Sequence, residues 1–219
     1  MHDAEIKGAI DALVQPKPYD LLQHWHNEPM NLMLIGLGAH AMFMYYPIME
    51  EFEATENVRF SYIVDLEIKR QSITNYLSQR SSRPDGIYLL EKDDVDLNEL
   101  PAHVRQHLDD AVREFNISGV VISTEPLAHM VYAKWALKRN LPILMDKPIS
   151  SREGVSHSVA QAKALMNDYS ELEELYKHAR IQNPRCVFSI MAQRRFHPAF
   201  IKVRELIKEV FDKTKCPIT

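Results

Sequence analysis

The amino-acid sequence predicts an α/β fold with a doubly wound, mostly parallel sheet. Short apolar runs alternate with segments of helical composition along most of the chain, a pattern typical of parallel strands covered by helices on both faces. A glycine-containing turn follows the first strong apolar run, and a later run leads directly into the sequence Asp-Lys-Pro. Because ligands of such sheets bind beyond the carboxyl ends of the strands, both turns are candidate functional segments.

The apolar runs give the expected elements in order. Strands are predicted at residues 31–35, 58–64, 86–90, 117–124, 142–145 and 186–192, the first ending at a glycine as a buried parallel strand often does. Helices are predicted at residues 4–14, 66–79, 101–115, 126–139, 159–179 and from Pro198 onward. The apolar stripe along 159–179 is expected to pack against the sheet, with a partner interface as the alternative.

Composition and charge narrow the class of protein. The 219 residues include 46% hydrophobic and 26% charged residues, as in ordinary globular proteins. The net charge of −4 and the lack of a basic run argue against a nucleic-acid partner. No apolar run reaches the length of a membrane span, and the first thirty residues lack a signal-peptide profile, so we expect no membrane association and a cytoplasmic location. Cys186 and Cys216 are interpreted as reduced thiols.

The turn after the first strand matches a dinucleotide-binding pattern. Residues 36–41 read Gly-Leu-Gly-Ala-His-Ala, the G-x-G-x-x-A form of the Rossmann fingerprint. Gly36 permits the tight turn, Gly38 lets the backbone approach a pyrophosphate, and Ala41 lets the helix pack on the strand. Ala39 and His40 are expected at the start of that helix, where their backbone amides would face the phosphates. An ordinary tight turn between a strand and a helix remains an alternative interpretation.

A proline modifies the helix that should follow this turn. Pro47 lies where a long first helix would normally continue, and proline both lacks an amide donor and clashes with the preceding turn. We therefore expect a short irregular turn after Ala41, with regular helix beginning near Pro47.

An acidic residue is predicted at the end of the second strand. A carboxylate at Asp65 can accept hydrogen bonds from the hydroxyls of an adenosine ribose and would repel a 2′-phosphate, which favours NAD over NADP. Lys69 and Arg70 follow closely and could support a phosphate instead, so NADP stays possible. The alternative is that Asp65 is the N-cap of a helix that begins at Leu66, and the two roles are compatible with each other.

The run at 142–145 leads into Asp146-Lys147-Pro148. A lysine at the carboxyl end of a parallel strand can act as a general acid or base. A cis bond before Pro148 would fix the direction of the lysine side chain. The alternative is a surface turn with a solvated lysine.

Four ordered motifs together resemble the glucose–fructose oxidoreductase/inositol dehydrogenase (Gfo/Idh/MocA) family. The family has a G-x-G-x-x-[GA] loop, and its Glu-Lys-Pro strand end corresponds to Asp146-Lys147-Pro148. Residues 120–129, Val-Val-Ile-Ser-Thr-Glu-Pro-Leu-Ala-His, are similar to its fourth strand and Thr-Pro-x-x-x-His turn, with Glu125 in place of the proline. Residues 191–198, Met-Ala-Gln-Arg-Arg-Phe-His-Pro, are similar to a strand-to-helix segment that supplies an arginine.

The resemblance implies roles for individual residues. Lys147 would be the catalytic, substrate-facing lysine, and Asp146 would hold the nicotinamide ribose. Arg195 would orient the substrate or the nicotinamide amide. The residues implied to line the cofactor cleft are Ser123, Thr124, Pro126 and His129. The alternatives are that His129 is an ordinary first-turn helix residue and that Arg195 is a solvated charge.

No metal site is expected, because the histidine pairs 24/26 and 103/107 lack a third ligand.

The resemblance also implies an activity and a division of the chain. It implies an NAD(P)-dependent oxidoreductase acting on CH–OH groups of a sugar, cyclitol or related polyol. The alternatives are a non-catalytic nucleotide-binding, sensing or scaffold protein, or an NAD-dependent glycosidase. Residues 1–30 would be an extension, 31–150 the dinucleotide-binding domain, and 151–219 its remainder plus the start of a truncated substrate domain. Such a fragment would be inactive alone, and the full-length form would be a homo-oligomer.

Overall fold

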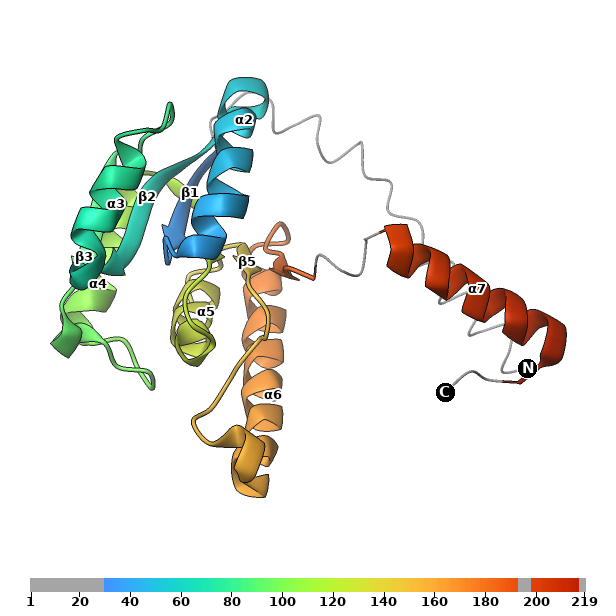
Figure 1. Ribbon diagram of the computed structural model, residues 1–219. Coiled ribbons are helices and arrows are strands. Elements are labelled where there is room, and N and C mark those ends of the chain that lie inside the picture. The colour runs from blue at the N-terminus through green and yellow to red at the C-terminus, as the bar shows by residue number, and fades with distance from the viewer. Residues whose placement is uncertain (1–29, 193–197, 217–219) are drawn as a thin grey trace.

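The sheet is parallel throughout the part of the chain that the structure describes. The structure is a computed structural model, and it describes residues 30–192 and 198–216. Its strands are β1 Met30–Ile35, β2 Val58–Leu66, β3 Gly86–Leu90, β4 Ile117–Ile122, β5 Ile143–Met145 and β6 Phe188–Ile190. They lie in the order β3-β2-β1-β4-β5-β6, and every neighbouring pair is parallel. Figure 1 shows β2 beside β1. The predicted doubly wound fold is therefore confirmed.

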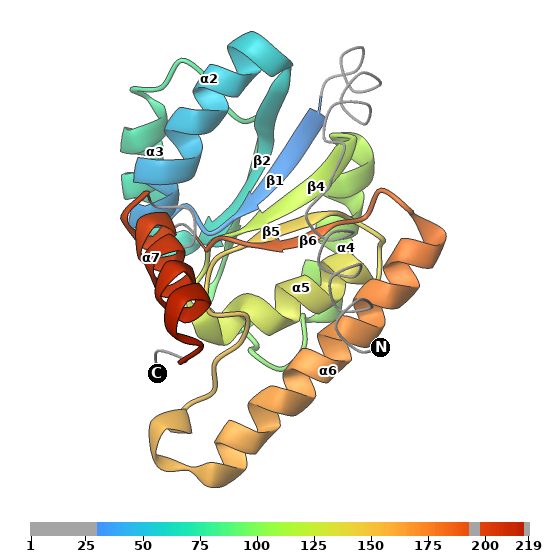
Figure 2. The ribbon, with the colours of Figure 1, turned by 90° about the vertical axis from the view of Figure 1, so that its right-hand side faces the viewer.

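Helices cover both faces of the sheet. The helices are α2 Tyr46–Glu56, α3 Arg70–Leu77, α4 Ala102–Glu114, α5 His129–Leu137, α6 Val159–Gln182 and α7 Pro198–Thr214. Shorter turns are η1 Ala41–Tyr45, η2 Glu67–Lys69, η3 Lys92–Asp94, η4 Pro126–Ala128 and η5 Val155–His157. Figure 2 shows α2 and α3 on one side of the sheet and α5 and α6 on the other.

The alternation of strand side chains builds two apolar layers. On β1, Met33 and Ile35 point into the layer beneath α4, α5 and α6, whereas Leu34 points into the layer beneath η1, α2 and α3. All three side chains are buried. Successive side chains of a strand face opposite ways, so a strand that is apolar at every position must be covered on both faces.

The central position of β1 creates a crevice at its carboxyl end. From β1 the chain proceeds outward to β2 and β3, then returns to β4 on the other side and proceeds to β5 and β6. The loops after β1 and β4 therefore run in opposite directions. In open α/β sheets, this reversal of strand order is where ligands bind.

Several element boundaries differ from those predicted. β4 ends at Ile122 rather than at residue 124, because the Ser123 side chain turns to Asp146 and the backbone of Thr124 lies against Gly36. The helix expected at 66–79 begins as the turn η2 and becomes regular α-helix at Arg70. The irregular turn after Ala41 is confirmed, since η1 is a π-helix and α2 begins at Tyr46 with Pro47 in its first turn.

The predicted packing of the 159–179 stripe is correct only for its second half. Leu172 and Ala179 are buried, but Val159, Met166 and Tyr169 are 74%, 72% and 56% exposed. A helix of 24 residues is about 36 Å long, and its first half extends past the sheet in Figure 2. The apolar periodicity is therefore longer than the surface available to cover it.

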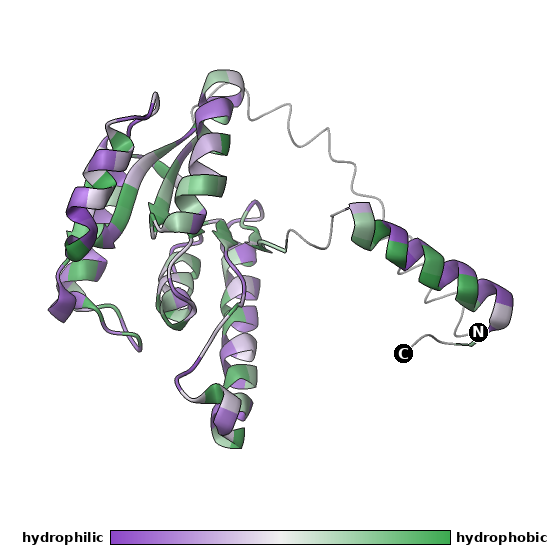
Figure 3. Ribbon diagram, viewed as in Figure 1, coloured by the Kyte–Doolittle hydropathy of each residue, from purple (hydrophilic) through white to green (hydrophobic). Residues whose placement is uncertain are grey.

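α7 is amphipathic and has no buried residue. Figure 3 shows its hydrophobic residues gathered along one stripe. Its start at Pro198 agrees with the prediction, whereas the helix predicted at 4–14 lies outside the described residues. Among the helices the structure describes, none combines the length and apolar character needed to span a bilayer.

Candidate nucleotide-binding site

The two glycines of the first loop have different surroundings. Gly36 has φ +94°, and a Cβ there would lie 2.6 Å from the Ser123 carbonyl oxygen. Only glycine fits that conformation and that close approach of the β1 and β4 ends. A Cβ on Gly38 would meet nothing within 4 Å. Gly38 therefore borders open space at the start of a helix, where backbone amides can face an anion.

The helix after the loop begins with a wide turn. The Tyr46 amide donates to the Ala41 carbonyl, closing the π-helical turn of η1. Pro47 has no amide to donate to the preceding turn, which explains why regular α-helix does not run back to Gly38. Ala41 is fully buried against the sheet, as expected for the small third residue of the fingerprint.

Asp65 faces the glycine loop from β2. Its Oδ2 accepts a hydrogen bond of 2.8 Å from the Leu37 amide, and its Oδ1 accepts one of 2.7 Å from the Leu66 amide. Lys69 Nζ lies 2.9 Å from Oδ1. Asp65 is 5% exposed, so the carboxylate is held between the loop and the lysine. The helix after β2 receives no side-chain cap, so the N-cap interpretation is wrong.

A cavity of about 200 Å³ lies beside Asp65 at the carboxyl edge of the sheet. It is lined by Ile35, Gly36, Val64, Asp65, Leu66, Lys69, Leu90, Val95, Thr124, Glu125, Ala128 and Tyr132. About half of these residues have apolar side chains, and Asp65, Lys69 and Thr124 are among those that supply charged or polar groups. A flat aromatic ring with a ribose attached suits such a lining. Burial, with a smaller contribution from the charge of Asp65, raises the pKa of Tyr132 above its usual range.

Asp146 lies on the other side of the glycine loop. Its Oδ2 accepts a hydrogen bond of 2.7 Å from Ser123 Oγ, and its Oδ1 accepts one from the Tyr45 hydroxyl. His40 Nε2 is 3.5 Å from Oδ1. Leu37 in the glycine loop thus contacts Asp65. His40 and Tyr45, which follow the loop, contact Asp146.

The remaining predicted residues surround this edge. Lys147 follows Asp146 directly and is exposed, and its bond to Pro148 is cis. Thr124 lines the cavity, and Pro126 begins η4 beside it. His129 is completely buried: Nδ1 lies 2.7 Å from the Pro148 carbonyl oxygen and Nε2 3.2 Å from that of Thr124.

The buried His129 side chain therefore connects the loop after β4 with the loop after β5. A neutral imidazole has one N–H, so it donates to one of these two carbonyls at a time. Its burial favours a role in holding the two loops together over direct contact with a ligand. Arg195 lies outside the described residues.

Three residues at this edge were not identified from the sequence. Tyr45, Tyr132 and Val95 carry no motif, because a tyrosine or valine at a helical or loop position is most often packing. The irregular turn caused by Pro47 was the one available signal for Tyr45, since a π-helical turn changes which side chains face the sheet.

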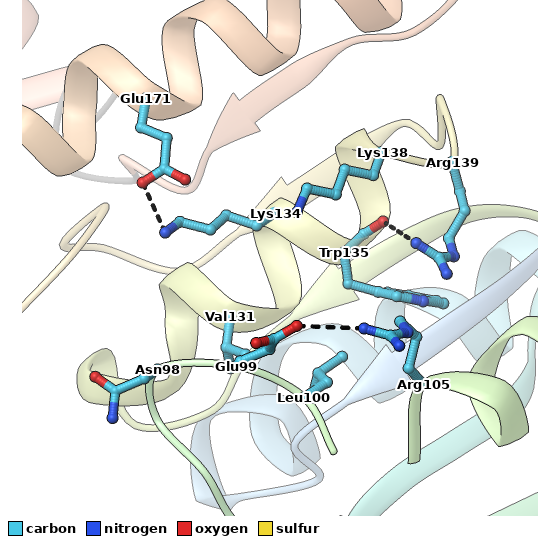
Figure 4. A pocket seen from close by; sticks show the side chains of 10 residues that line it. All are labelled: Asn98, Glu99, Leu100, Arg105, Val131, Lys134, Trp135, Lys138, Arg139 and Glu171. Carbon is cyan, nitrogen blue, oxygen red and sulfur yellow. Dashed lines mark hydrogen bonds and ion pairs between the residues drawn. The ribbon is translucent and has the colours of Figure 1, made fainter. Parts of the chain in front are cut away.

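A second cavity, of about 280 Å³, lies beside α4, α5 and α6. Figure 4 shows Lys134 pointing to Glu171 and Arg105 pointing to Glu99. Lys134 Nζ is 2.6 Å from Glu171, and Arg105 is 3.3 Å from Glu99. Because both carboxylates that line the cavity are paired with cations of its own lining, neither is left uncompensated for a cationic ligand.

The histidine pair of α4 is separated by its contacts. His103 Nε2 lies 2.7 Å from Asp94, whereas His107 lies 2.8 Å from the Tyr62 hydroxyl and stacks on Tyr88. No group of three His, Cys, Asp or Glu side chains within the described residues is placed to hold a metal ion.

Comparisons with known proteins give matches in structure only. No family model and no curated protein sequence matches the chain. A scyllo-inositol dehydrogenase from Lactobacillus casei, solved with NAD(H) and scyllo-inositol, superposes with a TM-score of 0.53 at 13% identity, over 84% of this chain and 42% of its own. A probable dehydrogenase from Thermotoga maritima gives 0.52 at 15% identity, over 82% and 41%. An oxidoreductase from Bacillus cereus gives 0.50 at 18%, over 83% and 40%.

These matches define the class of fold. The chain has the Rossmann-like fold found in oxidoreductases, in agreement with its resemblance to the glucose–fructose oxidoreductase/inositol dehydrogenase family. It spans about 40% of the length of the solved structures it matches.

Proposed function

We propose that this chain is the nucleotide-binding part of an NAD-dependent dehydrogenase of the Gfo/Idh/MocA type. Its substrate would be a sugar, cyclitol or related polyol. A larger protein that contains it would supply most of the substrate pocket and would assemble as a homo-oligomer. The substrate class rests on the resemblance in the sequence motifs and on the inositol dehydrogenase among the structural neighbours.

One observation carries the nucleotide-binding proposal. The Asp65 carboxylate accepts from the Leu37 amide and borders the cavity, while the space at Gly38 is open. A ribose held by Asp65 would have its attached pyrophosphate at the glycine loop, which is the geometry that the fingerprint residues are suited to. The residues present therefore fit a dinucleotide.

The surroundings of Asp65 favour NAD over NADP. A buried carboxylate repels a 2′-phosphate, whereas each of its oxygens has lone pairs for a ribose hydroxyl. Lys69 partly offsets the charge of Asp65 at 2.9 Å, and its side chain is 42% exposed. Rotation of Lys69 toward solvent would let it contact a 2′-phosphate, so the preference for NAD is expected to be moderate.

The chemistry would take place at the β5 end. The bound nicotinamide would accept or donate a hydride. Lys147 is exposed beside Asp146, and its amine would take the proton from the substrate hydroxyl or return it, as a general base or acid. Asp146 would orient the neighbouring ribose.

Titration with NADH tests the proposal. We expect saturable binding, followed by the fluorescence of NADH and by calorimetry, with weaker binding of NADPH. Asp65→Asn should lower NADH affinity about tenfold, which corresponds to about 1.4 kcal/mol. It should also reduce the difference in affinity between NADH and NADPH, because the carboxylate that repels the 2′-phosphate is gone. Asp168→Asn, the same change in a buried aspartate on α6, is the control and should leave affinity unchanged. Absence of binding at millimolar NADH would refute the proposal.

A non-catalytic nucleotide-binding protein of the same fold is the second candidate. Both carboxylate oxygens of Asp146 accept hydrogen bonds within the protein, an arrangement that a purely structural role for that residue would also produce. In a version of the protein that carries a substrate domain, NAD-dependent turnover of a polyol that Lys147→Ala abolishes would exclude this candidate. NADH binding without any turnover would support it.

A further inference from the structure

Two hydroxyl groups hold the Asp146 carboxylate from opposite oxygens. Tyr45 donates to Oδ1 and Ser123 donates to Oδ2. The Asp146 amide also donates to the Ile122 carbonyl at 2.9 Å, which fixes the backbone beside β4. The Asp146 side chain is 16% exposed, so it is mostly enclosed but still reaches the surface.

Tyr45 is suited to be a permanent donor. It is 3% exposed, and burial, followed by the hydrogen bond and the charge of Asp146, raises the pKa of Tyr45 far above its usual range. The phenol therefore stays protonated at neutral pH. The His40 ring packs against it nearly at right angles, with ring centroids 5.3 Å apart, which restricts the tyrosine ring further.

The π-helical turn gives Tyr45 this position. Tyr45 is the last residue of η1, and the next residue, Tyr46, begins α2 and points instead to the Ser82 carbonyl, to which it donates at 3.0 Å. Two adjacent buried tyrosines thus serve different contacts. Tyr45 joins the glycine-loop helix to the β5 end, and Tyr46 joins it to the loop before β3.

We propose that Tyr45 and Ser123 are positioning residues that orient Asp146 toward the nicotinamide half of the bound dinucleotide. This inference rests on the proposed function. A carboxylate has about four lone-pair sites, and the two hydroxyls take two of them. The outward-facing lone pairs stay available for a ribose hydroxyl, and the side chain cannot rotate away without breaking two hydrogen bonds.

The test compares Tyr45→Phe with Tyr46→Phe. The probes are NADH, which has both halves, and ADP, which lacks the nicotinamide ribose. We expect Tyr45→Phe to weaken NADH binding about tenfold, as for a hydrogen bond to a charged group, and to leave ADP binding unchanged. Tyr46→Phe should change neither affinity, because its hydroxyl donates to the Ser82 carbonyl, away from Asp146.

A double-mutant cycle separates positioning from general packing. In the Asp146→Asn background, Tyr45→Phe should have little further effect on NADH affinity, because both changes act on one contact. If Tyr45→Phe does not fold, Ser123→Ala removes the second donor and should produce the same loss for NADH alone.

The outcomes are distinguishable. Wild-type NADH affinity in a folded Tyr45→Phe or Ser123→Ala variant would overturn the inference. So would an equal loss for NADH and ADP, because that would indicate damage to the whole loop. A wild-type protein that binds neither NADH nor ADP would refute the proposed function itself, and with it this inference.

Discussion

Gly36 and Gly38 belong to one fingerprint but carry different physical constraints. At Gly36 the positive φ and the 2.6 Å approach to Ser123 both exclude a side chain. At Gly38 the protein itself excludes nothing within 4 Å. The first glycine is thus required by the fold, whereas the described protein leaves room for a side chain at the second. Under the proposed function, the pyrophosphate would be what requires a glycine at that position.

Alanine at each position should separate these two requirements. Gly36→Ala should destabilise the protein by about 2 kcal/mol or more, because the Cβ clashes with backbone at a strained φ. Gly38→Ala should change the unfolding free energy by no more than about 0.5 kcal/mol. It should weaken NADH binding, because its methyl would project toward the proposed position of the pyrophosphate. Urea denaturation and NADH titration measure the two effects. Normal NADH affinity in Gly38→Ala would contradict this placement of the phosphates.

Residues of the candidate site could be predicted from the sequence where a short local motif determines the backbone geometry. Gly36 and Asp65 follow from a strand, a turn and the next strand end, because those contacts arise from backbone topology. Tyr45 does not follow, since its contact with Asp146 joins residues 101 positions apart. No period or spacing in one sequence specifies such a side-chain pair.

At the scale of elements, strand positions were the most predictable feature. A strand buried on both faces must be apolar throughout. β1, predicted at residues 31–35, spans Met30–Ile35, and its last three side chains are buried. Helix coverage was less predictable, as α6 shows. Its apolar period continues over the first half, where Met166 is exposed, and periodicity alone does not reveal where the sheet ends.

α6 is fixed to the loop after β5 by one buried carboxylate. Asp168 is 5% exposed and accepts hydrogen bonds from Arg152 Nε at 2.9 Å and Ser150 Oγ at 2.8 Å. Burial alone would raise the pKa of Asp168, but these bonds outweigh it and hold the pKa below its usual range. Since the folded pKa lies below the unfolded value, this stabilisation is present above about pH 4 and is lost as pH falls through the folded pKa.

Asp168→Asn should therefore destabilise the protein in a pH-dependent way. We expect a loss of about 1–2 kcal/mol at pH 7, with the difference from wild type narrowing below about pH 4. Glu173→Gln is the control on the same helix, because Glu173 is exposed and pairs with Lys177 at 3.4 Å, so its loss should be under about 0.5 kcal/mol. Urea denaturation from pH 7 to pH 3 measures the unfolding free energies of both variants and of the wild type. If the loss in Asp168→Asn stayed constant across this range, the charge of Asp168 would not be its cause.

For the whole molecule, the decisive feature is that one loop joins the two halves of the sheet. The β1 loop contacts β2 through Leu37 and Asp65, and the β4 and β5 ends through Gly36, Tyr45 and their partners. The strand order predicts such a crevice, but the contacts across it depend on side chains that the topology does not specify. A ligand lying along the loop would contact elements from both halves and favour the folded state as a unit.

Ligand binding should consequently stabilise the entire fold. At an NADH concentration one hundred times its dissociation constant, the unfolding free energy should rise by about 2.7 kcal/mol, provided that only the folded state binds. Thermal and urea unfolding should shift together, because the crevice is formed by strands that unfold with the sheet. Gly38→Ala, at the same NADH concentration, should show a smaller shift in proportion to its weaker affinity. If NADH raised the unfolding free energy of Gly38→Ala as much as that of the wild type, the nucleotide would have to bind elsewhere on the molecule.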